Sequence, residues 1–255
     1  DARIPLSSKN PEIDKLAQNK PRVVVLNKSD LSDKAKLNKW ISYYQSKGIK
    51  AIPVDTLKGN GVNKIVEECK NATKEKMDAL KEKGRKERAI RVMIVGVPNV
   101  GKSSLINKLT GRKSTQTGDR PGVTKGKQWV RLKGNLELLD TPGILWPKFE
   151  DQKIALNLAF TRAIKDEILD IDTLGLKFIE KMSEIEPEKL KARYKLDSLG
   201  EEPLETMEMI GRKRGFILGR NELDYTRIAK TVLNEFREGK LGQITLEVPE
   251  DIEEA

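Results

Sequence analysis

The amino-acid sequence predicts an α/β fold followed by a smaller, all-helical domain. In the first part of the chain, short β-branched apolar runs alternate with segments of helical periodicity. This alternation favours a mostly parallel sheet with helices on both faces. Beyond about residue 148 the strand signal fades and helical periodicity remains. We therefore expect an α/β domain over residues 1–150, a helical domain over residues 151–246, and a frayed acidic tail over residues 247–255.

The elements of the α/β part follow from local pattern. The run Val23-Val24-Val25 predicts a buried strand that ends at Asn27. Residues 110–127 are rich in Gly, Thr, Lys and Arg without periodicity, which predicts a mobile loop. Strands are expected at residues 22–26, 51–54, 90–95, 127–132 and 136–139, and helices at residues 32–47, 62–88 and 103–109.

The helices of the second part are marked by their ends. Pro187 and Pro203 suit the first position of a helix, because proline lacks the N–H that is unsatisfied there. Gly200, Gly215 and Gly239 suit helix ends. Helices are expected near residues 151–166, 170–183, 187–194, 203–213 and 223–238.

Charge and residue counts narrow the functional classes. The chain has 49 Lys and Arg against 39 Asp and Glu, a formal net charge of +10. That balance fits attraction to phosphate backbones, and it also fits a soluble protein with solvated basic faces. Histidine is absent. A histidine base, a histidine metal site and a Ser-His-Asp triad within this chain are therefore excluded.

Two further counts bear on the compartment. The single cysteine, Cys69, excludes an internal disulfide framework and fits a reducing, cytoplasmic location. No apolar run approaches the roughly 20 residues of a membrane span. We therefore expect no contact with a membrane.

A phosphate-binding loop is the most specific motif. The run Gly-Val-Pro-Asn-Val-Gly-Lys-Ser begins at Gly96, between a predicted strand and a predicted helix, which is the context that this motif requires. Gly96 and Gly101 permit close approach of the backbone to phosphate. Lys102 is expected to reach the β- and γ-phosphates and to act in catalysis, and Ser103 to ligate Mg²⁺. The expected contacts are Asn99, Val100, Gly101, Lys102, Ser103 and Ser104.

A second motif, Asp-Thr-Pro-Gly, begins at Asp140 and follows a predicted strand. Asp140 is expected to hold Mg²⁺, and the backbone N–H of Gly143 to meet the γ-phosphate. Such a sequence is also a common turn, so the motif supports a nucleotide site only because it lies at the end of a predicted strand. In the preceding loop, Thr124 is our choice for a residue that closes on Mg²⁺ and the γ-phosphate, with Thr115 and Thr117 as alternatives. Gly143 and Thr124 thus count as catalytic.

A third motif, Asn-Lys-Ser-Asp, begins at Asn27 and also follows a predicted strand. The Asp30 carboxylate can accept from the ring N–H and the amine of guanine, a donor pair that adenine lacks. Asn27 would brace the phosphate loop, and the stem of Lys28 would lie along the base. The alternative is helix capping by Asp30 or Ser32.

The order of the motifs is unusual, because the guanine reader precedes the phosphate loop. With the three motifs in this order, the chain resembles the circularly permuted GTPases, and within them the ribosome biogenesis GTPase A (YlqF) type. The residues that carry the resemblance lie at 1–5 (Asp-Ala-Arg-Ile-Pro), 27–30, 96–107 and 236–242 (Phe-Arg-Glu-Gly-Lys-Leu-Gly).

The resemblance implies a P-loop GTPase sheet with circularly permuted motif order and a small all-α C-terminal domain. It implies binding of GTP and GDP with Mg²⁺, and hydrolysis of GTP. It further implies an assembly factor for the large ribosomal subunit, which binds pre-ribosomal particles in the GTP state and leaves after hydrolysis. The helical domain would contact ribosomal RNA. We expect a cytoplasmic monomer that binds neither membrane nor DNA.

The sequence departs from the resemblance at three places. Ile144 stands where Ras-like enzymes have a water-orienting Gln, so we expect weak intrinsic hydrolysis that the ribosomal partner activates. The loop that backs guanine with a Ser-Ala pair in relatives is replaced, leaving Asp55 and Thr56 as the expected contacts. No strand precedes Asp1, so an element of the sheet is expected to be missing.

Asn99 is also a candidate ligand. Related GTPases with a Pro-Asn pair in this loop use the Asn to hold K⁺ beside the phosphates. The alternative is that Asn99 only serves the turn.

Basic residues of the helical part allow two interpretations. Arg212 and Arg214 end one predicted helix, and Arg227, Lys230 and Arg237 recur along the last. They could cap helix ends. They could also form a patch that binds RNA phosphates, which the net charge favours.

Two other functions remain open. The chain could be a GTPase switch in another RNA-related pathway. It could also be an RNA-binding adaptor in which the nucleotide mainly stabilises the fold.

Overall fold

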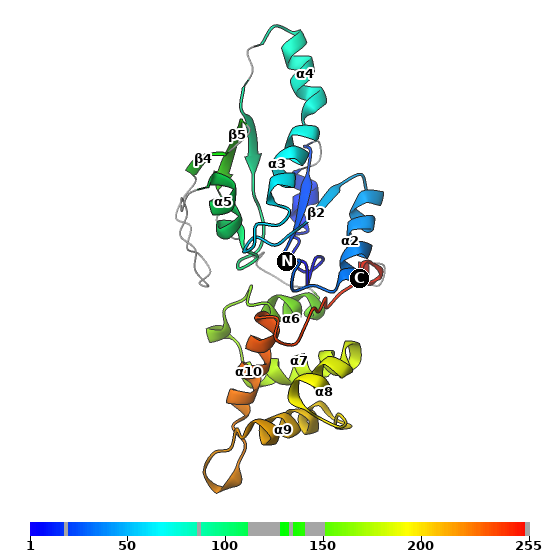
Figure 1. Cartoon of the computed structure of the whole chain (residues 1–255), viewed down its shortest axis with the longest axis vertical. Helices are drawn as coiled ribbons and strands as arrows, with labels where there is room; N and C mark the ends of the chain where they lie inside the picture. Colours follow the sequence, from blue (N-terminus) through cyan, green and yellow to red (C-terminus); the bar gives the residue numbers. More distant parts are fainter. Residues whose placement is uncertain (18–19, 86–87, 112–127, 133–134, 141–150, 253–255) are drawn as a thin grey trace.

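The structure, a computed structural model, describes residues 1–17, 20–85, 88–111, 128–132, 135–140 and 151–252, with the backbone alone for residues 128–130 and 140. A strand-containing part sits above a group of helices (Figure 1). In the described part of the chain, no helix is both long and apolar enough to cross a bilayer. In chain order the elements are α1 (Glu12–Leu16), β1 (Val23–Asn27), α2 (Lys34–Ser46), β2 (Lys50–Val54), α3 (Val62–Asn71), α4 (Lys74–Glu82), β3 (Ile90–Met93), α5 (Lys102–Thr110), β4 (Gln128–Leu132), β5 (Leu136–Asp140), α6 (Gln152–Phe160), α7 (Ile171–Ile185), α8 (Pro187–Tyr194), α9 (Pro203–Arg214) and α10 (Tyr225–Arg237), with short 3-10 turns η1 (Asp166–Ile168), η2 (Gly219–Asn221) and η3 (Pro249–Ile252).

The described strands form two hydrogen-bonded groups. β1 pairs with β2 in parallel, with Val25 opposite Ile52. β5 lies between β3, which is parallel to it, and β4, which is antiparallel. The expected parallel pairing is therefore present, but within the described residues no ladder joins the two groups into one sheet.

Side chains of β1 alternate between two apolar clusters. Val23 and Val25 face a cluster that contains Ile52 of β2 and side chains of α3 and α5. Val24 and Leu26 face the cluster formed with α2. Successive residues of a strand point to opposite faces, so helices cover both sides of the β1–β2 pair.

The three-stranded group is covered on one face by α5. Leu105 and Leu109 of this helix pack with Leu136 and Leu138 of β5. On the opposite face, Met93 of β3 remains 58% exposed.

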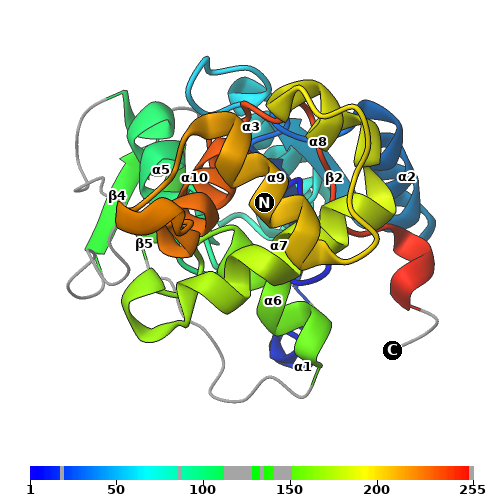
Figure 2. The ribbon, with the colours of Figure 1, turned by 90° about the horizontal axis from the view of Figure 1, so that it is seen from below.

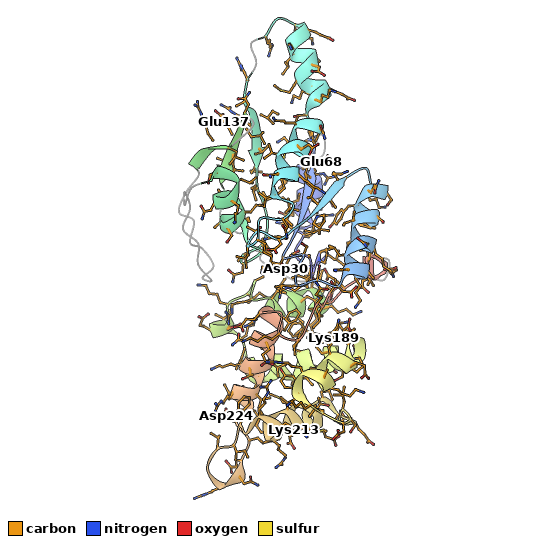
Figure 3. All side chains as sticks on the ribbon, in the orientation of Figure 1. Asp30, Glu68, Glu137, Lys189, Lys213 and Asp224 are labelled. Atoms are coloured by element: carbon orange, nitrogen blue, oxygen red, sulfur yellow. The ribbon has the colours of Figure 1, made fainter. Side chains whose placement is uncertain are left out.

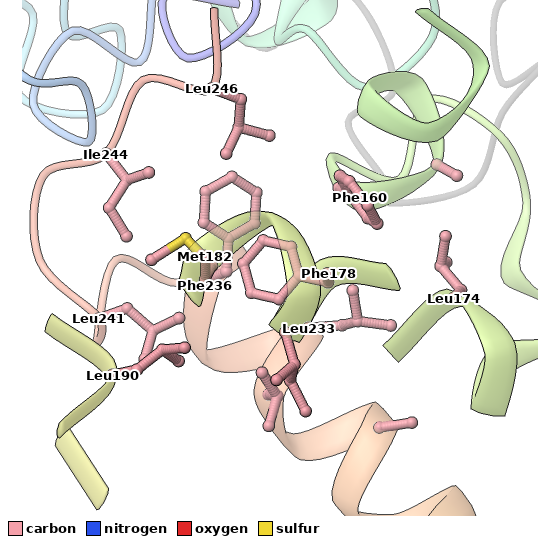
Figure 4. Close-up of a cluster of buried hydrophobic side chains, with 14 of the residues drawn as sticks. Phe160, Leu174, Phe178, Met182, Leu190, Leu233, Phe236, Leu241, Ile244 and Leu246 are labelled. Atoms are coloured by element: carbon pink, nitrogen blue, oxygen red, sulfur yellow. The ribbon is translucent and has the colours of Figure 1, made fainter. Parts of the chain in front are cut away.

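The helical part has its own core, formed by α6 to α10 together with the chain that follows α10 (Figure 4). The ring of Phe178 lies 5.1 Å from that of Phe160 and 4.8 Å from that of Phe236. Ile4 and Val97, from the strand-containing part, are buried in this same core. The view from below shows the helices gathered under the strands (Figure 2).

The helix expected over residues 62–88 is wrong in two respects. It is divided into α3 and α4, and it ends at Glu82. At the division, the Thr73 hydroxyl donates to the main-chain carbonyls of Cys69, at 2.9 Å, and Lys70, at 3.2 Å. Such a bond competes with the continuation of a helix.

Other helix ends are partly as predicted. Pro187 and Pro203 begin α8 and α9, and Gly215 follows α9 in the left-handed region. α8 spans residues 187–194 as expected, but the left-handed residue that follows it is Lys195 and not Gly200. The helix expected at residues 151–166 ends at Phe160, just before the left-handed Arg162, and α1 was not predicted.

The acidic tail is ordered where it begins, contrary to expectation. Glu247 is 5% exposed. Its carboxylate accepts from the main-chain N–H of Leu6 and Ser7, from the Ser7 hydroxyl at 2.7 Å, and from the Asn157 amide at 3.1 Å. Its own carbonyl accepts from Trp40 Nε1 at 3.1 Å. The tail thus fastens the amino-terminal loop to α2 and α6.

Burial raises the pKa of the Glu247 carboxyl to about 7, although its hydrogen bonds oppose the shift. A folded-state pKa above the ordinary value of 4.5 means that the folded protein binds this proton more tightly than the unfolded chain does. The stability that this group contributes is therefore present below about pH 4.5 and is lost as the pH rises through 7.

We expect Glu247→Gln to remove this pH dependence. From about pH 5 to about pH 8, the free energy of unfolding of the wild type should fall relative to that of the variant by up to about 3 kcal/mol. Chemical denaturation across this range measures the difference.

Glu250→Gln is the matched control, because Glu250 is exposed and pairs with Lys39. It should leave the pH profile unchanged. A difference between wild type and Glu247→Gln that does not vary with pH would contradict the assignment.

Candidate functional site

Three of the predicted loops converge at the carboxyl ends of strands. The Asn27 loop follows β1, the Thr56 loop follows β2, and the phosphate loop follows β3. Asp30 lies where the strand-containing part meets the helices (Figure 3). β1 and β2 are parallel, so their carboxyl ends lie at one edge and the loops that follow them meet there. The phosphate loop follows a strand of the other group and meets them through side-chain contacts.

The side-chain amide of Asn27 joins all three loops. Its Nδ2 donates to the Val100 carbonyl of the phosphate loop at 2.7 Å. Its Oδ1 accepts from the Thr56 hydroxyl at 2.7 Å and from the Thr56 N–H at 3.3 Å. Asn27 and Thr56 are both buried, so the two bonds between them are made away from water.

Gly101 is required by this contact. It adopts a φ of 91°, in the left-handed region, and a Cβ built on it would overlap Asn27 Nδ2. It also directly precedes α5, which begins at Lys102. The first N–H groups of a helix lack partners within the helix and carry partial positive charge, so this loop suits an anion.

Lys102 folds back over the phosphate loop. Its Nζ donates to the carbonyls of Gly96, at 2.9 Å, and Val97, at 3.1 Å. Ser103 and Ser104 are half-buried in the first turn of α5. The loop thus gathers a cation, a helix amino terminus and two hydroxyl-bearing residues in one place.

Lys28 spans from the guanine loop to the phosphate loop. It adopts a left-handed φ of 58°, and its Nζ donates to the Asn99 carbonyl at 2.7 Å and lies 3.0 Å from the Asp1 carboxylate. Asp30 is half-buried in the turn that follows. Burial lowers the pKa of the neighbouring Arg3 to about 10, and the charge of Asp30 opposes that shift.

Asp55, in the loop after β2, is 4% exposed. Its Oδ1 accepts from the Lys58 N–H at 3.0 Å. Its Oδ2 has no hydrogen-bond partner among the described residues, although the exposed Lys58 Nζ lies 3.9 Å away. Buried polar atoms are usually satisfied, so this oxygen marks a polar position beside Asn27 and Thr56.

Asn99 contacts the helical part, which its sequence context did not predict. It adopts a φ of 58°, and its Nδ2 donates to the Arg162 carbonyl at 2.6 Å. Arg162, left-handed at a φ of 62°, binds Asp166 at 3.1 Å and Asn234 Oδ1 at 3.0 Å through its guanidinium. Arg162 meets Asn99 through its main chain, so its residue type gave no signal of this role.

The sequence predicted that Arg237 shares an exposed face with the other cations of α10, and this prediction is wrong. Its guanidinium donates to the carbonyls of Ala159, at 2.9 Å, and Phe160, at 2.8 Å, where α6 ends. It also pairs with Asp166 at 2.8 Å. Burial lowers the pKa of Arg237, and the Asp166 charge opposes this. Arg237 is therefore a structural residue.

The three basic residues at the end of α9 differ in whether they pair with other side chains. Arg214 pairs with Glu235 at 3.3 Å and stacks on the Tyr194 ring at 5.2 Å. Arg212 and Lys213 are exposed, and within the described residues neither forms an ion pair.

The cations of α10 that do face solvent are Arg227 and Lys230. Arg227 lies 4.6 Å from the centroid of the Phe216 ring. Together they line a shallow hollow with Asp224, Thr226, Thr231 and Asn234.

Part of the predicted site lies outside the described residues. Thr124, Gly143 and Ile144 fall there, as does the side chain of Asp140. The backbone does place Asp140 at the end of β5, which runs parallel to β3. Asp140 and Ser103 therefore lie at the same edge of the strands, and their oxygens suit Mg²⁺. In the parts of the chain that are described, no cluster of three acidic, Cys or His side chains offers a separate metal site.

Known proteins resemble this chain along its whole length. A family model described as "50S ribosome-binding GTPase" matches residues 91–205. A Bacillus cereus protein named ribosome biogenesis GTPase A is 48% identical, with 100% of this chain and 86% of the relative covered. The Thermotoga maritima protein of the same name is 31% identical, with 99% and 85% covered.

Solved structures agree with these relatives. A GDP-bound YlqF superposes with a TM-score of 0.70 at 27% identity, covering 98% of this chain and 92% of that one. The GNP-bound YlqF from Thermotoga maritima gives 0.65 at 28% identity, covering 98% and 90%. The mixed α/β arrangement is thus that of a GTPase. By sequence and by fold, the chain belongs to the ribosome biogenesis GTPase A family and is a GTPase.

Proposed function

We propose that the chain is a GTP-driven assembly factor for the large ribosomal subunit, which binds pre-ribosomal particles with GTP and leaves them after hydrolysis. The observation that carries the proposal is the joining of the guanine loop to the phosphate loop through Asn27. The names of the relatives supply the pathway. The motif order supports a circularly permuted GTPase domain over residues 1–150 and a ribosome-binding helical domain over residues 151–246.

The base and the phosphates would be held by different loops. Asp30 reads the guanine edge, Asn27 and Lys28 support the base, and Asp55 and Thr56 lie behind it. The loop of Asn99, Val100, Gly101, Lys102, Ser103 and Ser104 surrounds the phosphates. The proximity of these loops supports this division of roles.

Hydrolysis would be assisted by charge at the phosphates. Lys102 offsets negative charge that develops during phosphoryl transfer, and the Gly143 N–H meets the γ-phosphate. Ser103, Asp140 and Thr124 would hold Mg²⁺, which neutralises phosphate charge when bound. With Ile144 in place of a water-orienting Gln, we propose a slow intrinsic rate that the ribosomal particle raises.

The helical part would meet RNA through its exposed cations. Arg212 and Lys213 on α9, and Arg227 and Lys230 on α10, are available to phosphates. Arg214 and Arg237 already serve internal contacts. We propose a cytoplasmic monomer whose partner is ribosomal RNA, with no role for DNA or membrane.

Co-sedimentation with ribosomal subunits tests the function. We expect the chain to pellet with large subunits in the presence of a non-hydrolysable GTP analogue and to stay in the supernatant with GDP. Added subunits should also raise GTP turnover well above that of the chain alone. Equal binding with both nucleotides would favour the adaptor, and binding with neither would favour another pathway. Turnover of many per second without subunits would contradict a slow intrinsic rate.

Reversing two exposed charges tests the RNA-binding face. The double variant Arg212→Glu and Lys213→Glu should weaken subunit binding on the order of ten-fold and flatten its salt dependence, because fewer phosphate contacts release fewer counterions. GTP affinity should stay unchanged. The matched control reverses Lys74 and Lys76, which are exposed on α4 at the far end of the molecule (Figure 1). Equal loss in both double variants would point to a general charge effect.

Replacing the cation in the buffer tests the role of Asn99. We propose that Asn99 Oδ1 holds K⁺ beside the phosphates, so turnover should be several-fold faster in K⁺ than in Na⁺. Asn99→Ala should remove that preference. Asn99→Asp lacks the N–H that meets Arg162 but keeps an oxygen, so it should retain the preference. Equal rates in both salts for the wild type would exclude a K⁺ site.

A further inference from the structure

The segment that follows α10 returns across the guanine loop. We call residues 241–247 the strap. The Gln243 side-chain amide donates to the Asp30 carbonyl at 3.0 Å, and the Ile244 N–H donates to the Leu31 carbonyl at 2.9 Å. The chain after α10 runs upward beside the foot of α2 (Figure 1). These two hydrogen bonds join residues that are more than two hundred positions apart in the sequence.

The strap also holds the start of α2. The Thr245 hydroxyl accepts from the Asp33 N–H at 3.0 Å, and the Thr245 carbonyl accepts from Lys36 Nζ at 3.1 Å. The Asp33 side chain caps α2 by accepting from the Lys36 N–H. The turn that carries Asp30 is thus fixed on its far side by a capped helix that the strap contacts.

The strap is itself anchored in the helical core. Leu241, Ile244 and Leu246 are buried among the side chains of α7, α8 and α10 (Figure 4). Gly239, which precedes the strap, has a φ of +75°, and a Cβ on it would lie 2.6 Å from Leu31 Cδ2. The Gly-Lys-Leu-Gly run after α10 therefore brings the chain against the guanine loop.

We propose that the strap is a positioning element of the guanine site, with Gln243 and Thr245 as its positioning residues. This inference rests on the proposed role of Asp30. Neither residue would touch the base. They hold the main chain at the Asp30 carbonyl and at the Asp33 N–H, so that the Asp30 carboxylate meets the ring N–H and the amine of guanine in fixed geometry. Recognition that depends on a paired donor set is sensitive to small displacements of the acceptor.

Inosine diphosphate separates positioning from general stability. It lacks the exocyclic amine of guanine, so the ratio of its Kd to that of GDP reports how well Asp30 is aimed. A segment that only fastened the chain would change the melting temperature and leave this ratio alone. Gln243 is exposed, so its replacement should not disturb folding.

We expect Gln243→Ala to weaken GDP binding roughly two- to ten-fold, the range for one lost hydrogen bond, and to lower the inosine-to-guanosine ratio. Gln243→Glu should lower the ratio further, because a carboxylate faces the Asp30 carbonyl without a proton to donate. Thr245→Val, which leaves the Asp33 N–H unpaired, should act in the same direction. Fluorescence titration with labelled GDP and competition by inosine diphosphate give both constants.

Lys240→Ala is the matched control, since Lys240 is exposed just before the strap and pairs with Glu238. It should leave both constants unchanged. An unchanged ratio in all strap variants would overturn the inference while the guanine site stands. Wild-type protein that binds ADP as tightly as GDP would instead overturn the guanine site itself.

Discussion

The buried amide of Asn27 is the contact on which the nucleotide site depends. One side chain donates to the phosphate loop and accepts from the loop after β2, so the two halves of the site cannot shift independently. Gly101 has no side chain at the point where the amide passes. In the described residues, β1 and β3 belong to separate hydrogen-bonded groups. The Asn27 amide therefore joins loops that no main-chain ladder between these strands holds together.

The phosphate loop also has a second support, from below. Val97 is buried in the helical core and Val100 packs against it, although both belong to a loop that follows a strand. Asn99, between them, donates to Arg162 at the end of α6. A displacement of this loop would therefore have to repack an apolar core, and packed cores resist continuous deformation. The phosphate loop is therefore held both by the strands above it and by the helical core below it.

Local patterns predicted most elements but few of the contacts between the two parts. The β-branched run at Val23 and the helix-starting Pro187 act through their own neighbours, so sequence sufficed for them. Glu247 in an acidic tail looked solvated, and only Ser7 and Asn157 explain its burial. Arg237 looked like part of a basic face and instead binds α6 carbonyls. Such partners lie far away in sequence, where periodicity carries no information.

The hydrogen bond between Asn99 and Arg162 uses a side chain from one residue and the main chain from the other. Position 99 must supply a side-chain donor, whereas position 162 supplies a main-chain carbonyl held by a left-handed backbone. Over evolution, Gly or Asn at position 162 would keep the bond to Asn99, although the guanidinium contacts to Asp166 and Asn234 would be lost. Substitutions at positions 99 and 162 would therefore not be correlated through this bond. A link between the halves of this molecule could thus persist through long divergence while leaving no paired substitutions to reveal it.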